Sequence, residues 1–325
     1  AAYVEILRVK ISKVRNAITE TREAIVGSRG ASYLPELYLR LAELMSEEAR
    51  YHHRVAFERE QRSSETLHVP EVRLLKEQAI GVYKKILKEF PDSGLSDKVL
   101  FNIGHEHREL GNYQEMQQYL ERLIREHPRS PLMSEALLVL GDYHFDRSEL
   151  EQARAYYEKI TGAEPGRVTE LAFYKLAWVW VNLAECDQAL RAFEGALKAA
   201  RESDERRKQA AAAATRARKK GGEQKVDGEP GAVSVTGELD RAEAEEARKL
   251  RQGIDVPRAA LVDLVYCYSQ ERKANKAVGY LKKLARNRTN YVAALEKMAR
   301  RYGVMNEAAG SISVLRELLR LAPSG

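Results

Sequence analysis

The chain has 325 residues, of which 44% are hydrophobic and 31% charged, and its 54 basic and 48 acidic residues give a net charge of +6. This mild excess, with both signs interspersed, argues against a dedicated nucleic-acid-binding protein and fits a charged surface with one local basic patch. Helix-favouring Ala, Leu, Glu, Arg and Lys dominate, while Val, Ile and Thr never alternate over a strand's length, so we expect an all-α fold.

No stretch of 18 apolar residues occurs, so no membrane-spanning helix is expected. The chain opens with "AAYVEILRVK", which has neither Met nor a signal-like apolar segment. This start leaves the compartment open.

The first predicted element is a long helix over residues 1–26. Its apolar residues form one stripe that ends near the turn at 27–30, namely Val4, Leu7, Ile11, Val14, Ile18 and Ile25. We favour an interpretation in which this helix caps the structure that follows, since the ends of a helical array need covering. The alternative is self-association through a coiled coil.

A repeat dominates the middle of the chain. The segment "LLVLGDYHFDRSELEQARAYYEKI" at 137–160 matches the sequence 37 residues earlier, with Gly141 on Gly104 and Tyr157 on Leu120. It matches again 36 residues later, with Ala177 and Phe193 at these two positions. A period of 34–37 residues predicts stacked helical hairpins, in which the small residue of the first helix allows the second helix to approach closely.

The same register extends in both directions from the central copies. Further copies place Ala79, Tyr83, Ile86, Leu264, Val265, Tyr268, Ala277, Leu281, Met298, Ala299, Tyr302 and Leu315 at equivalent positions. His144 and His107 share one of these positions with Trp180 and Tyr268, so we interpret both histidines as packing residues. Pro91, Pro128 and Pro165 follow the second helices and end them.

These positions resemble the tetratricopeptide repeat (TPR) family. The resemblance implies a right-handed TPR-like helical-hairpin solenoid of about five to six hairpins, with the long N-terminal helix and a flexible insertion. We divide the chain into 1–30 (N-terminal helix or cap), 31–200 (first block of hairpins), 201–253 (charged insertion) and 254–325 (C-terminal block). Within the insertion, we expect the preceding helix to continue to about Lys220, a flexible loop over 221–238, and a helix over 239–250.

In TPR proteins the first helices line a concave groove that binds peptides. Carrying those positions over gives a partner-binding groove of Phe101, His105, Arg108, Leu138, Asp142, Phe145, Tyr174, Trp178 and Tyr266. Tyr174 and Trp178 add aromatic residues on a second face of their helix, so that helix is covered on both sides. The cover is either an extended or helical segment of a partner protein, or this chain's own residues 201–253 or 1–26.

The pattern does not fit the carboxylate-clamp TPRs, because Asn102 is replaced by Val139 and Lys175 in the following repeats.

The run from Arg206 to Lys220 is a candidate basic patch, made of Arg206, Arg207, Lys208, Arg216, Arg218, Lys219 and Lys220. A solvated linker is the preferred interpretation. The alternative is an adaptor that binds nucleic acid or an anionic membrane surface through this segment. No aromatic residues interleave with the charges, so base stacking is not expected and any membrane contact is peripheral.

No catalytic motif, cofactor site or metal site is found, and we expect a non-enzymatic protein. His105 and His107 point roughly 200° apart on a helix and cannot share a metal ion. Cys186 and Cys267 are far apart in sequence, and we interpret them as buried thiols.

Two further features resemble particular TPR proteins. The Pro-x-Ser turns in "EFPDSGLSDKVL" and "EHPRSPLMSEALLVLG" are similar to those of the Gram-negative envelope TPR proteins of the BamD and CpoB types. The first hairpin, "LYLRLAELMSEEARYHH", is similar to large TPR lipoproteins of motility complexes. The resemblance implies a protein-binding scaffold in the periplasm or at the outer membrane, with a cytoplasmic location as the alternative.

Overall fold

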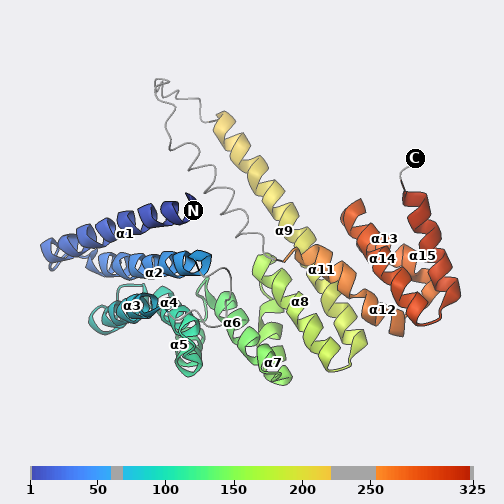
Figure 1. The fold of residues 1–325 in the computed structure, drawn as a ribbon, viewed down its shortest axis with the longest axis horizontal. Helices are drawn as coiled ribbons and strands as arrows, with labels where there is room; N and C mark the ends of the chain where they lie inside the picture. The colour runs from blue at the N-terminus through green and yellow to red at the C-terminus, as the bar shows by residue number, and fades with distance from the viewer. Residues whose placement is uncertain (1, 60–68, 221–253, 323–325) are drawn as a thin grey trace. The chain divides into compact units, whose positions relative to one another are not determined.

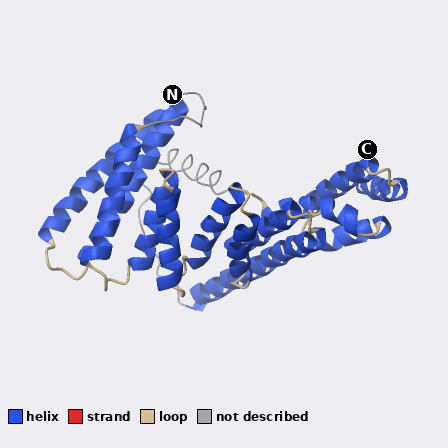
Figure 2. Cartoon of the chain, turned by 90° about the horizontal axis from the view of Figure 1, so that it is seen from below, coloured by secondary structure: helices blue, strands red, loops and turns tan. Residues whose placement is uncertain are grey.

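The computed structural model describes residues 2–59, 69–220 and 254–322, and the regular secondary structure in these ranges is helical (Figures 1 and 2). The chain divides into two compact units, residues 1–140 and 141–325. The predicted all-α, TPR-like solenoid of stacked hairpins is confirmed.

Unit 1 contains α1 (Ala2–Gly27), α2 (Leu34–Arg59), α3 (Pro70–Glu89), α4 (Ser96–Glu109), α5 (Tyr113–Glu126) and the first half of α6 (Met133–Asp146). Helix α1 packs on α2, and Leu7, Ile11, Val14 and Ile18 of its apolar stripe are buried. These residues of the stripe are therefore covered by this chain's own helices. That is what the capping interpretation requires. Self-association through residues 1–26 stays a prediction.

Unit 2 continues with α7 (Leu150–Thr161), α8 (Arg167–Asn182), α9 (Cys186–Lys220), α11 (Val256–Asp263), α12 (Val265–Glu271), η2 (Ala274–Lys276), α13 (Ala277–Leu284), α14 (Arg288–Val304) and α15 (Ala308–Leu321). The 35-residue helix α9 continues to Lys220, the last described residue before 254, as the sequence predicts. The loop expected over 221–238 and the helix expected over 239–250 lie outside the described residues.

Small residues set the distance between the two helices of a hairpin, as predicted. A Cβ atom on Gly104 would lie 2.7 Å from Cδ2 of Leu120, and one on Gly141 would lie 2.5 Å from Cε1 of Tyr157. In the hairpin of α8 and α9 there is a close contact of the opposite kind, because a Cβ on Gly195 of the second helix would lie 2.6 Å from Cδ1 of Phe173 on the first. Each of these pairs leaves no room for a larger side chain.

Four first helices end in the same backbone motif. The residue after the helix cap has a positive φ in each, at Gly111 (74°), Ser148 (60°), Ala184 (61°) and Asn306 (56°). The next N–H then donates to the carbonyl five residues back, in the pairs Asn112–His107, Glu149–His144, Glu185–Trp180 and Glu307–Tyr302, all at 2.9 Å. This is a Schellman motif, which satisfies the last carbonyls of the helix.

The predicted packing role of the histidines fits this geometry. His144 stacks on Tyr156, and its Nδ1 lies 2.6 Å from Oε2 of Glu149, across the hairpin turn. His107 is buried and stacks on Tyr119. Both imidazoles therefore brace the two helices of their hairpin.

The interpretation of Cys186 and Cys267 as separate thiols is wrong. The two cysteines form a disulfide that joins the first turn of α9 to α12. Sequence spacing does not reveal this bond, because stacking of the hairpins brings α12 against α9 across 81 residues.

Candidate partner-binding surface

The predicted groove residues fall in both units, so each set is described within its own unit. In unit 1, Phe101, His105 and Arg108 lie on α4 and Leu138 lies on α6. Arg108 is exposed, and the other three are half-buried. His105 Nε2 lies 3.6 Å from Oε1 of Glu109, one turn further along the helix.

A buried ion cluster holds α4 against α3. The sequence pattern did not predict it. The Lys76 ammonium, on α3, lies 2.7 Å from Oε2 of Glu106 and also bonds Glu109. Lys76 and Glu106 are 4% and 3% exposed. Burial alone would raise the pKa of Glu109, but the hydrogen bond and charge of Lys76 outweigh it, and the pKa of Glu109 is lowered.

In unit 2, Asp142 links two successive first helices. It accepts a hydrogen bond from the Tyr157 hydroxyl at 2.7 Å and lies 2.9 Å from the Lys175 ammonium of α8. Burial, reinforced by the Asp142 charge, raises the pKa of Tyr157, so its hydroxyl remains a donor. Phe145, one turn along α6, is half-buried.

Tyr174 is tied into a polar chain that crosses three helices. Its hydroxyl donates to Oδ2 of Asp263 on α11 at 2.8 Å, and Lys297 on α14 donates to Oδ1 of the same carboxylate at 2.8 Å. Burial raises the pKa of Tyr174 to about 12, and the Asp263 charge adds to this effect. These hydrogen bonds fix the Tyr174 ring at the surface of unit 2.

The neighbouring aromatic side chains extend this surface. Trp178 lies one turn after Tyr174, half-buried, with its ring edge-on to Phe193 at 6.3 Å between centroids. Tyr266 on α12 is 43% exposed, and the Arg301 guanidinium lies 4.7 Å from its ring centroid. Arg301 also donates to Ser269 Oγ at 3.1 Å.

We refer to this set as the aromatic–basic surface, and it comprises Tyr174, Trp178, Asp263, Tyr266, Lys297 and Arg301. Tyr174, Trp178 and Tyr266 are predicted groove residues, whereas the prediction missed Asp263, Lys297 and Arg301. The structure links Tyr174 to Asp263 and Lys297, and it links Tyr266 to Arg301. A signal was present in the sequence. Lys175, Asp263 and Lys297 each stand two residues before the small position of their repeat, where Asn102 stands in an earlier copy.

The predicted basic patch lies on the exposed part of α9. Arg206 is 3.0 Å from Glu164, Arg207 pairs with Asp204, and Lys208 is 2.9 Å from Glu205. Arg216 is exposed. The side chains of Arg218, Lys219 and Lys220 fall outside the described residues, at the end of α9. Three of the predicted cations are therefore already neutralised by carboxylates.

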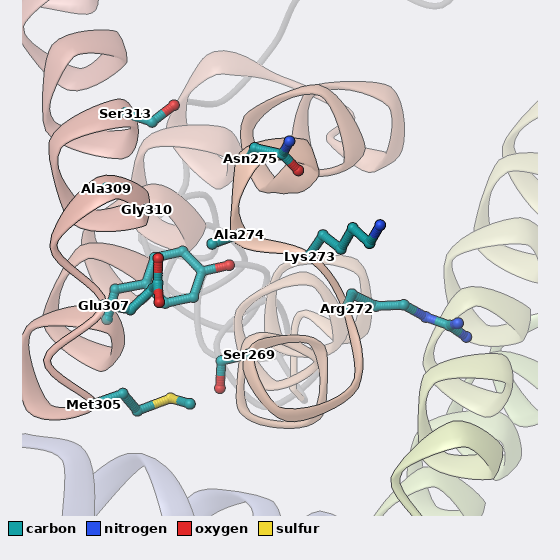
Figure 3. Close-up of a pocket in the computed structure, with 11 residues that line it drawn as sticks. Ser269, Arg272, Lys273, Ala274, Asn275, Met305, Glu307, Ala309, Gly310 and Ser313 are labelled. Carbon is teal, nitrogen blue, oxygen red and sulfur yellow. The ribbon is translucent and has the colours of Figure 1, made fainter.

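A cavity of about 520 Å³ lies between the last two hairpins (Figure 3). Ser269, Lys273 and Asn275 line it on one side, and Glu307 and Ser313 line it on the other. In Figure 3 the Arg272 side chain extends away from Glu307, and the guanidinium pairs with Asp187 of α9 at 2.9 Å.

Known proteins support the repeat assignment. A family model for the tetratricopeptide repeat matches residues 101–167. The matched segment runs from within α4 to the first residue of α8 and includes α5, α6 and α7. Matched residues include Gly104, Leu120, Gly141 and Tyr157, which make the close helix contacts described above.

Solved structures of similar fold include BtubC (BKLC) from P. vanneervenii, with 14% identity, 92% of each chain covered and a TM-score of 0.47. The C-terminal part of a TPR repeat-containing protein from Cytophaga hutchinsonii shares 14% identity over 100% of this chain and 96% of that chain, with a TM-score of 0.45. MamA shares 16% identity over 73% of this chain and 99% of that chain, with a TM-score of 0.38. No curated protein matches the sequence.

In the described ranges, no helix is long and apolar enough to cross a membrane. Nor do the described His, Cys, Asp and Glu side chains form a group of three or more that could hold a metal ion.

Proposed function

We propose that this chain is a protein-binding scaffold, and that the aromatic–basic surface of unit 2 binds an extended or helical segment of a partner protein. TPR proteins in general bind protein partners. The observation that carries the proposal is the pairing of exposed Tyr266 with Arg301, which lies one helical turn along α14 from Lys297. Aromatic and Arg side chains are the residues most often found at the energetic centre of protein interfaces.

The chemistry of the surface specifies the partner segment. Trp178 and Tyr266 offer apolar area, while Lys297 and Arg301 lie one helical turn apart on α14 and offer two positive charges. A segment with one or two apolar side chains next to a carboxylate would satisfy both. The carboxylate would compete with Asp263 for Lys297, so binding and the internal polar chain are coupled.

The disulfide supports a location in an oxidising compartment, since such bonds persist there and are rare in reducing cytosol. Together with the Pro-x-Ser turns, it favours the periplasm or the outer-membrane surface, within an envelope or motility complex. A second copy of the chain, joined through residues 1–26, is a further candidate partner.

A photo-crosslinking amino acid at position 178, in cells that make the protein, tests this proposal. We expect a crosslink to another protein, identified by mass spectrometry. Position 198 on α9 is the matched control, because the Lys198 side chain is 77% exposed and is not part of the aromatic–basic surface. Crosslinks from 178 only to residues 201–253 or 1–26 would mean that this chain covers its own surface, and the proposal would fail.

The second candidate function is an adaptor that binds nucleic acid or anionic membrane through α9. It is favoured by the uninterrupted exposure of residues 205–216. Binding of this kind falls steeply as salt is raised, whereas binding at the aromatic–basic surface depends less on salt. A salt titration of binding therefore separates the two functions.

A further inference from the structure

Tyr302 on α14 departs from a pattern that earlier hairpins share. It occupies the repeat position at which, in three of those hairpins, a polar side-chain atom contacts the residue five positions further on. These pairs are His107–Asn112 (3.4 Å), His144–Glu149 (2.6 Å) and Tyr268–Lys273 (3.3 Å). Tyr302 is 1% exposed, and its hydroxyl has no hydrogen-bond partner among the described residues.

The Tyr302 hydroxyl is a buried donor in search of an acceptor. Burial raises the pKa of Tyr302, and the charges of Tyr268 and Glu307 add to this effect, so the hydroxyl keeps its proton. Gly310 holds the ring close to α15, because a Cβ there would lie 2.9 Å from Cδ2 of Tyr302. Buried polar groups without a partner are rare in folded proteins, so this hydroxyl points to a bound group that supplies the acceptor.

Tyr302 lines the cavity of about 520 Å³ between the last two hairpins (Figure 3). A water molecule takes up about 30 Å³ in the liquid, so this space is far larger than one bridging water requires. Pockets that bind small ligands measure about 300–1,000 Å³. Met305, Ala309 and Gly310 make part of the lining apolar. The volume and lining therefore fit a small organic molecule.

Opposite charges stand on the two sides of this cavity. Lys273 and Asn275 come from the turn between α12 and α13, and Glu307 comes from the turn between α14 and α15. In Figure 3 the Lys273 ammonium and the Glu307 carboxylate lie on opposite sides. Neither forms an ion pair within the described part of the chain, whereas Arg272 is already paired with Asp187. The cavity therefore offers one cation and one anion to a ligand.

The neutral polar groups of the lining differ in what they have left to offer. Ser269 Oγ donates to the Tyr266 carbonyl at 2.7 Å and accepts from Arg301 at 3.1 Å, so its main hydrogen bonds are already made. Asn275 and Ser313 line the cavity from its two sides. Together with Tyr302 they provide neutral donors between the two charges.

We propose that this cavity binds a small zwitterion, either a free α-amino acid or a short peptide. The carboxylate of the ligand lies toward Lys273 and Asn275, its ammonium group pairs with Glu307, and one of its oxygen atoms accepts the Tyr302 hydroxyl. Charge-assisted hydrogen bonds at both ends fix the orientation of the ligand. The inference does not rest on the proposed protein-binding function, since the aromatic–basic surface contributes no lining residue.

Isothermal titration calorimetry with the full chain tests the class of ligand. The probes are the twenty common L-amino acids, one at a time, and the peptides dialanine and trialanine. We expect saturable binding of at least one probe. Binding of amino acids alone identifies a free amino acid as the ligand, and binding of peptides alone identifies a peptide. The N-acetylated and C-amidated forms of that probe should each bind about tenfold or more weakly, because each lacks one charge.

Two conservative substitutions place the ligand in the cavity. Tyr302→Phe removes only the hydroxyl and should weaken binding of the probe by about tenfold. It should not destabilise the ligand-free chain, because the hydroxyl has no partner to lose. Glu307→Gln should weaken binding of the probe by about tenfold or more and leave binding of its N-acetylated form unchanged.

Tyr291→Phe is the matched control for the loss of a hydroxyl. Tyr291 is also on α14, but it lies outside the cavity and its hydroxyl is 3.2 Å from Oε1 of Glu317. This variant should bind the probe as the unchanged chain does and should be less stable toward urea. Circular dichroism confirms that each variant is folded.

Three results would overturn the proposal. The first is no saturable binding of any of these probes by the unchanged chain. The second is binding that neither Tyr302→Phe nor Glu307→Gln weakens, which would place the ligand elsewhere. The third is equal affinity for the probe and its N-acetylated form, which would exclude a zwitterion. None of these results bears on the crosslinks from position 178, which test the protein-binding function separately.

Discussion

A methyl group on Gly141 would lie 2.5 Å from Cε1 of Tyr157, well inside van der Waals contact. Tyr157 is 0% exposed and its hydroxyl is held by Asp142, so the ring has no free space to enter. This one contact sets how closely α6 and α7 approach. It also explains why the repeat places a small residue opposite a large one.

Gly141→Ala is therefore expected to destabilise the protein by about 1–3 kcal/mol through overpacking, despite the higher helix propensity of Ala. Gly81→Ala is the matched control. Gly81 is also inside a helix, but a Cβ there would meet nothing within 4 Å, so this change should stabilise by about 0.5–1 kcal/mol. Urea unfolding followed by circular dichroism measures both. Equal effects of the two substitutions would contradict the packing argument.

Ala184→Gly is expected to stabilise unit 2. Ala184 has φ 61°, which costs an L-residue roughly 1 kcal/mol relative to glycine. The gain should therefore be about 0.5–1 kcal/mol, and Ser148→Gly should act in the same direction. Both tryptophans lie in α8, so fluorescence during urea unfolding reports on unit 2. Ala212→Gly, in the exposed helical part of α9, should not stabilise, since glycine loses helix propensity there.

Removing the Lys76 side-chain charge should be costly. In Lys76→Met the Glu106 carboxylate stays buried without its partner, and the loss should be about 3–5 kcal/mol at neutral pH. The double variant Lys76→Met/Glu106→Gln should recover part of this loss, because the unpaired charge is gone. Urea unfolding by circular dichroism at neutral pH compares the three proteins. If the double variant is no more stable than Lys76→Met, the buried charge is not the cause.

Acid should weaken the same cluster. Folding lowers the pKa of Glu109 from its usual 4.5. The stability that the ionised carboxylate contributes is therefore complete above about pH 4.5. This stability is lost as the pH falls through the lower pKa of the folded state. Glu109→Gln should lose less stability than the unchanged chain on acidification below pH 4.5. Unfolding midpoints measured across that range test the sign, and a larger acid effect in the variant would refute it.

The disulfide should stabilise the C-terminal hairpins. Replacing both Cys186 and Cys267 by Ala should cost about 2–5 kcal/mol, seen in the tryptophan fluorescence of unit 2. Thiol titration of the unfolded, unreduced protein should find no reactive thiol, and reduction should release two. Two reactive thiols before reduction, in protein isolated from its native compartment, would remove the argument for an oxidising location.

The sequence by itself determined the repeat and its hairpins. Gly104, Gly141 and Ala177 recur with Leu120, Tyr157 and Phe193 because close helix packing imposes a local and periodic requirement. The continuation of α9 to Lys220 was also predictable, since helix propensity is a local property.

Only the tertiary structure decided which distant groups meet. The disulfide between Cys186 and Cys267, the buried ion cluster of Lys76 and the link from Tyr174 through Asp263 to Lys297 all join separate helices. Such contacts depend on the rotation and offset between stacked helices, which side-chain packing sets. The repeat register marks Asp263 and Lys297 as equivalent positions, but it does not show which groups they meet.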